Sequence, residues 1–169
     1  MIMRKLCLKK NSNFCIYKPI LLAFLLVTSS YCSNDNTQIF ITEIINNNNW
    51  SVENIKSFQF EVKDIQSPYN LNVVVKHTDE YPKSNLWLFI TITNQNNFNQ
   101  KDTVECKLAR LDGKWLGQKK WRSWEISKPI MSGFIFPATG RYNIEIEHAM
   151  RFKEVKGIRS VGIMLQKHK

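Results

Sequence analysis

The chain has 169 residues, enough for one domain behind an N-terminal leader, and its 43% hydrophobic content is ordinary for a globular protein. The net charge is +10, but five of the 24 basic residues and none of the 14 acidic residues lie in the first 31 positions. The remaining chain is mildly basic, at +5, so we expect no nucleic-acid partner.

The first 31 residues have the features of a secretory signal peptide. A basic start precedes the apolar run Ile20–Val27 and the small residues Thr28–Ser30. This run is shorter than the roughly 20 residues that span a bilayer. Cys32 follows directly, which predicts a lipoprotein signal and lipid attachment at Cys32. Cleavage after Ser30 by an ordinary signal peptidase is the alternative, because Tyr31 stands where lipoprotein signals usually have a small residue.

Apolar residues alternate with polar ones in several segments of the first half, which is typical of half-buried strands. The segment Leu86–Thr93 is apolar on both faces at first, which predicts a strand covered on both sides. The other expected strands are Ile39–Ile41, Ser57–Lys63 with Phe58, Phe60 and Val62 inward, and Tyr69–His77.

The second half continues this pattern around one long irregular stretch. Asp102–Leu108 is expected to be a strand, and Ala109–Lys128 a long loop. Phe134–Phe136 and Tyr142–His148, separated by the turn Pro137–Gly140, predict a hairpin at the centre of the domain. The last expected strand is Ile158–Gln166.

Seven or eight strands without a long helical period predict an all-β fold, an antiparallel β-sandwich of jelly-roll or immunoglobulin-like type. The expected organisation is a signal peptide over residues 1–31, a polar tether and first short strand over 32–50, and the sandwich over 51–169. Cys7 and Cys15 leave with the leader and Cys32 is acylated, so Cys106 has no disulfide partner. We expect it to be a buried, inert thiol.

The polar residues give little indication of catalysis. His77, Asp79 and Glu80 could join Glu147 and His148 in a metal or acid–base site, but both histidines alternate with apolar residues, as core histidines do. No nucleophile elbow or phosphate-binding loop is present. We therefore expect no catalytic residues, no metal and no cofactor, and a protein that is not an enzyme.

Aromatic and basic residues interleave only in the stretch 113–128. Four uses remain open: covering the core, anchoring a protein interface, stacking on sugar rings, or lying near anionic lipid headgroups. The candidate contact residues are Trp115, Trp121, Trp124, Lys119, Lys120 and Arg122.

From Phe58 to Gln166 the chain resembles the GldH gliding-motility lipoproteins of Bacteroidetes-type bacteria. The resemblance is carried by YNLNVVVKHTDEYPKSNLWLFITIT, DTVECKLARLDGKWLG, FPATGRYNIEIEHAMR and GIRSVGIMLQK. It implies a small outer-envelope lipoprotein of the gliding apparatus, which is tied to a dedicated secretion system, with the acylated cysteine at Cys32 and no cofactor.

The function expected from the sequence is therefore that of a non-enzymatic accessory protein, lipid-anchored in the cell envelope at the outer membrane. It is expected to act through contacts with other gliding or secretion proteins. The alternative is a carbohydrate- or peptidoglycan-binding sandwich, which predicts an exposed row of the rings of Trp115, Trp121 and Trp124.

Overall fold

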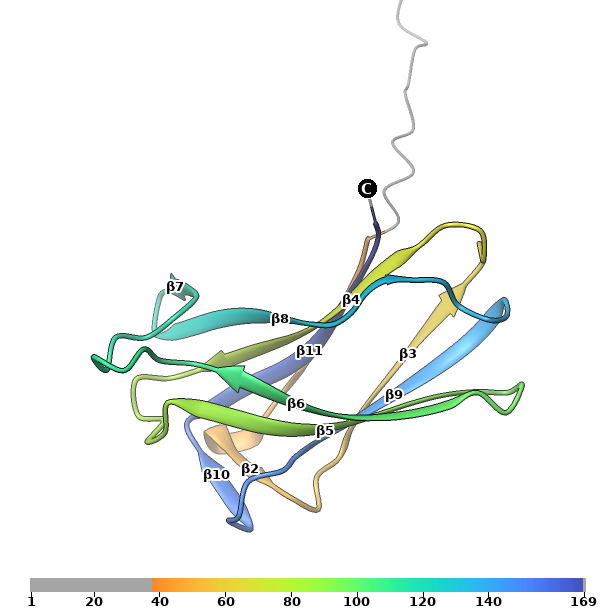
Figure 1. The fold of residues 1–169 in the computed structure, drawn as a ribbon. Helices are drawn as coiled ribbons and strands as arrows, with labels where there is room; N and C mark the ends of the chain where they lie inside the picture. The colour runs from red at the N-terminus through yellow and green to blue at the C-terminus, as the bar shows by residue number, and fades with distance from the viewer. Residues whose placement is uncertain (1–37, 169) are drawn as a thin grey trace, which may run out of the picture. The chain divides into compact units, whose positions relative to one another are not determined.

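Two antiparallel sheets, packed face to face, dominate the computed structural model, which describes residues 38–168 (Figure 1). The larger sheet has the strand order β1 (Gln38–Ile44), β11 (Ile158–Lys167), β4 (Tyr69–His77), β8 (Ser123–Phe134) and β7 (Gln118–Lys120). The smaller has the order β3 (Lys56–Val62), β9 (Gly140–His148), β5 (Asn85–Asn94) and β6 (Asn99–Lys107). A short ribbon pairs β2 (Asn49–Ser51) with β10 (Glu154–Lys156), and a 3-10 turn, η1, covers Asn46–Asn48.

The pairing of the eight long strands is nested. The first pairs with the last (β1 with β11), the second with the seventh (β3 with β9), the third with the sixth (β4 with β8) and the fourth with the fifth (β5 with β6). Eight strands that fold back on themselves in this way form a jelly roll, whereas the immunoglobulin fold divides its strands differently. The predicted antiparallel sandwich is confirmed, and it takes the jelly-roll form.

Alternating side chains build the core between the sheets. In β3 every second residue from Lys56 onward is buried, and the same holds for β9 from Tyr142 to His148. Aromatic rings cluster at one end of this core, where Tyr142 lies 4.8 Å from Phe136 and 5.7 Å from Phe60, between ring centroids. Aromatic pairs at these separations add to the hydrophobic stabilisation of the two layers.

The segment Phe134–His148 is not the hairpin that the sequence predicted. β8 pairs with β4 in the larger sheet, while β9 lies between β3 and β5 in the smaller one. Residues 135–139 therefore cross from one sheet to the other, and Phe136 is buried where they cross. The turn residues Pro137 and Gly140 indicate a change of direction, but they do not determine which strand becomes the neighbour.

Two further expectations were wrong. The strand β5 is covered on one face only, because Trp87 and Phe89 are 39% and 46% exposed on the other. The stretch 109–128 is not one loop, since its second half contains β7 and the start of β8, joined by the two residues Trp121 and Arg122. β7 has three exposed residues and no burial alternation, so it gave no strand signal.

The thiol of Cys106 is buried, as predicted, and burial raises its pKa to about 12. Strand β1 belongs to the larger sheet through its pairing with β11, so the sandwich includes the residues from Gln38 onward. Within residues 38–168, no helix has the length and hydropathy needed to cross a membrane. The predicted leader, with Cys32, lies outside the described residues.

Candidate functional site

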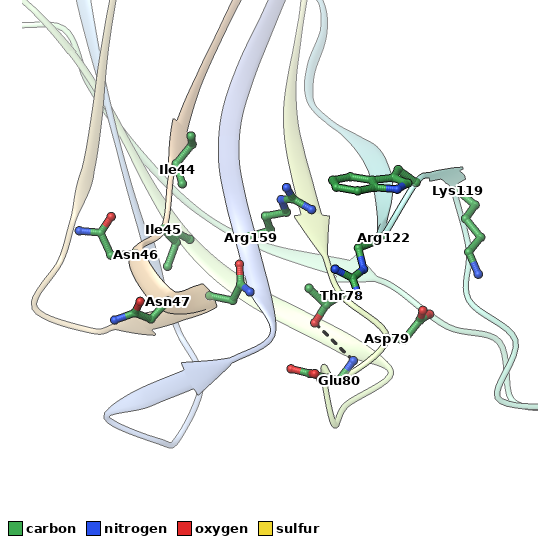
Figure 2. A pocket seen from close by; sticks show the side chains of 12 residues that line it. Ile44, Ile45, Asn46, Asn47, Thr78, Asp79, Glu80, Lys119, Arg122 and Arg159 are labelled. Carbon is green, nitrogen blue, oxygen red and sulfur yellow. Dashed lines mark hydrogen bonds between the residues drawn. The ribbon is translucent and has the colours of Figure 1, made fainter.

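An open cleft of about 820 Å³ lies where β1 ends (Figure 2). Its walls come from distant parts of the sequence: the end of β1 with η1, the loop that follows β4, the tip of the β7–β8 hairpin, and the start of β11. The lining residues are Ile44, Ile45, Asn46, Asn47, Asn48, Thr78, Asp79, Glu80, Lys119, Trp121, Arg122 and Arg159.

Trp121 is the most exposed tryptophan of the basic stretch and stands at the hairpin tip. Its side chain is 80% exposed, and its φ angle is +52°. It is the first of two turn residues, the position that glycine occupies in type II′ hairpin turns. A bulky residue with positive φ costs about 1 to 3 kcal/mol and is often found at functional sites. The hairpin therefore holds an exposed indole in an unfavourable backbone conformation.

Two arginines accompany this ring. The guanidinium carbon of Arg122 lies 5.8 Å from the ring centroid of Trp121, and that of Arg159, from β11, lies 6.0 Å from it. No carboxylate among residues 38–168 lies within ion-pair distance of either arginine. The two guanidinium groups are thus gathered around one indole without an acidic partner in the described part of the chain.

Trp124 and Lys120 have structural contacts. The indole nitrogen of Trp124 donates a 2.7 Å hydrogen bond to Oδ1 of Asp79, and this bond ties the hairpin to the loop after β4. Lys120 pairs with Glu125, which Lys76 reaches at 3.0 Å. Burial raises the pKa of Glu125, but the hydrogen bonds from the two lysines outweigh it and leave that pKa below its usual value.

Trp115 belongs to the core. It is half-buried, and its ring centroid lies 4.6 Å from that of His77. The three tryptophans therefore do not form an exposed row: Trp121 is open to solvent, Trp124 is half-buried against Asp79, and Trp115 packs inward.

The histidines are core residues, as the sequence indicated. His77 is fully buried in the larger sheet, and its Nδ1 donates to the carbonyl of Thr78 at 3.0 Å. His148 is buried in the smaller sheet with its ring against Trp50, at 5.5 Å between centroids. Burial lowers the pKa of both. Glu147 precedes His148 on the strand, so its side chain points to the other face.

No three His, Cys, Asp or Glu side chains gather into a metal-binding group within the described residues. His77, Glu147 and His148 are therefore not grouped as the metal site considered from the sequence would require.

The cleft includes only part of the predicted contact set. Lys119, Trp121 and Arg122 line it, whereas Trp115, Trp124 and Lys120 do not. Sequence reasoning missed Arg159 and the amides of Asn46–Asn48. Arg159 gave no signal because it lies in a strand 37 positions after Arg122, and only the fold brings the two together.

Comparison with known proteins gives a match to the GldH lipoprotein family over residues 41–165. The gliding motility lipoprotein GldH of Flavobacterium johnsoniae is 27% identical over 124 residues, which cover 69% of this chain and 77% of that protein. A GldH homolog of Christiangramia forsetii is 25% identical over 130 residues, covering 70% and 77%.

Among solved structures, dimeric latent PorU from Porphyromonas gingivalis aligns with a TM-score of 0.31 and 12% identity. The alignment covers 78% of this chain and 13% of that one, and a score this low supports no structural argument.

Proposed function

Because the chain belongs to the GldH lipoprotein family, we propose that it is a lipid-anchored accessory protein of the gliding motility machinery and acts through protein contacts. The observation that carries this proposal is the extent of the family match, which runs from β1 to β11 and so covers nearly the whole sandwich. The names of the two relatives support the link to gliding.

The anchor is Cys32, six positions before Gln38, the first described residue of β1. One acyl chain holds a protein to a membrane only weakly, whereas two or more give stable attachment. A diacylated or triacylated Cys32 therefore keeps the domain at the envelope, at the outer membrane in this proposal.

The contact surface is the tip of the β7–β8 hairpin. Trp and Arg are the residue types most enriched where protein interfaces gain their binding energy. Trp121 and Arg122 supply both, and Lys119 adds a third exposed side chain. The carbohydrate alternative receives less support, because Trp115 is half-buried with its ring against His77.

The domain has a binding role and no catalytic one in this proposal. His77 and His148, the two histidines considered for chemistry, are buried in different sheets. Neither lines the cleft.

Two experiments test the proposal. Metabolic labelling with a palmitate analogue is expected to be lost in Cys32→Ala and kept in Cys15→Ala, because Cys15 is removed with the leader. A labelled Cys32→Ala protein would refute the anchor. Deletion of the gene is expected to stop surface translocation, with recovery on complementation. Normal gliding by the deletion strain would refute the role in motility.

A further inference from the structure

We propose that the cleft binds a short segment of a partner protein through one acidic side chain, held by Arg122 and Arg159 beside Trp121. This inference rests on the proposed role in protein contacts. It adds the chemistry of the partner and a residue, Arg159, that the sequence did not indicate.

The case for an anionic group comes from the two arginines. They reach the same indole from different elements, the hairpin turn and β11, and no described carboxylate neutralises them. An arginine presents a planar fork of donors that matches a carboxylate with two parallel hydrogen bonds. Attraction to the ring holds each guanidinium group beside the indole, so less side-chain entropy is lost when a ligand arrives.

The loop after β4 limits the charge of that ligand. Asp79 and Glu80 line the cleft together with Lys119, Arg122 and Arg159, so its charged side chains leave an excess of a single positive charge. A phosphate or a polyanionic chain would bring several negative charges toward these two carboxylates. A single carboxylate adds the least negative charge beside Asp79 and Glu80, which Figure 2 shows on the loop beneath Arg122.

The remaining wall suits a peptide. Asn46, Asn47 and Asn48 line it, and each amide can both donate to a carbonyl and accept from an N–H.

The test is photo-crosslinking of the full chain in the cells that make it. We would place p-benzoylphenylalanine at Asn46, an exposed lining residue, and sequence the peptide that is captured. The expected adduct is a protein segment with Asp or Glu within about three residues of the crosslink. The pair Arg122→Gln and Arg159→Gln is expected to lower its yield at least tenfold, the loss expected for a charged hydrogen-bonded pair.

Two controls separate the specific effect from a general one. Lys101→Gln with Lys153→Gln removes the same charge from exposed positions outside the cleft, and we expect an unchanged yield. Arg122→Lys with Arg159→Lys keeps the charge but loses the fork, and we expect an intermediate yield. Arg159 is half-buried, so thermal unfolding of each purified variant is measured alongside.

The inference is wrong if the glutamine pair, once shown to be folded, crosslinks as well as the wild type. It is also wrong if the adduct is a lipid, a saccharide or a peptide without an acidic residue, or if no adduct forms. Failure of the broader proposal looks different. A deletion strain that glides normally removes the motility role and leaves the crosslinking result intact. A deletion strain that cannot glide, together with a folded glutamine pair that crosslinks as well as the wild type, removes only the cleft.

Discussion

Replacing Trp121 with asparagine should separate its binding role from any role in folding. About a fifth of the side chain is buried, since it is 80% exposed. A tryptophan buries about 250 Å² at most, so some 50 Å² returns to water, at a cost of about 1 kcal/mol. Asparagine tolerates positive φ and recovers about 1 kcal/mol of backbone strain. The two terms nearly cancel, and we expect the free energy of unfolding to change by less than about 1 kcal/mol.

The effect on binding should be much larger. A tryptophan at the centre of an interface contributes about 2 kcal/mol or more, which is roughly a thirtyfold loss of affinity. Urea unfolding of the purified protein measures stability, and the crosslink at Asn46 together with colony spreading measures function. Trp50→Phe is the matched control, because Trp50 is fully buried and donates to the carbonyl of Asn54 at 2.8 Å. Leaving that carbonyl unpaired is expected to cost about 2 kcal/mol.

The reasoning fails if Trp121→Asn loses more than about 2 kcal/mol of stability, because the indole would then be part of the fold. It fails equally if crosslinking and spreading both stay at the wild-type level.

Three further predictions concern the sandwich. Burial lowers the pKa of His77 and His148 below 6.5, so the folded state binds fewer protons than the unfolded state. The free energy of unfolding should therefore fall as the pH drops below 6.5. For each histidine the fall is at most about 1.4 kcal/mol per pH unit. Urea unfolding at pH 7.0 and 5.5 measures this, and equal values would contradict it. Gly157→Ala should cost about 2 kcal/mol or more in thermal unfolding, because its φ is +88° and a Cβ would lie 2.7 Å from the backbone of Tyr81. Gly113→Ala, with φ +81° and open space around it, should cost only about 1 kcal/mol, and equal losses would exclude the steric argument. Cys106 should react with iodoacetamide at pH 8 only after unfolding, since burial raises its pKa to about 12, and rapid labelling of the native protein would contradict this.

Local alternation made much of the fold predictable. Strands β3, β4 and β9 were found with their inward faces because one face of each packs on the core, and burial follows a period of two. The same reasoning failed for β5. Trp87 and Phe89 made it look covered on both faces, but side-chain type alone does not show whether anything packs on the outer surface.

Strand partners were not predictable in the same way. A turn at Pro137–Gly140 is compatible with a hairpin and with a crossover, and hydrogen bonding to β4 and β3, far away in sequence, decides between them. The candidate site shows the same limit. Trp121 and Arg122 were selected because they are neighbours in a basic stretch, whereas Arg159 and Asn46 reach the cleft only through the nested pairing of the sheets. The positive φ of Trp121 had no signal, because no glycine stands there.

In the sequence, strand β1 lies between the proposed lipid anchor and the cleft, the two points at which a mechanical force would act on the molecule. The proposed anchor, Cys32, precedes Gln38 in the sequence, and the residues that follow Ile44 line the cleft together with Arg159 at the start of β11. A pull along β1 from Gln38, against a partner held by Arg159 of β11, would load the seven residue pairs between these two strands together, in shear. Strands sheared in this way share the load among all their hydrogen bonds, whereas peeled strands break them one after another, so the geometry suits a coupling that transmits tension.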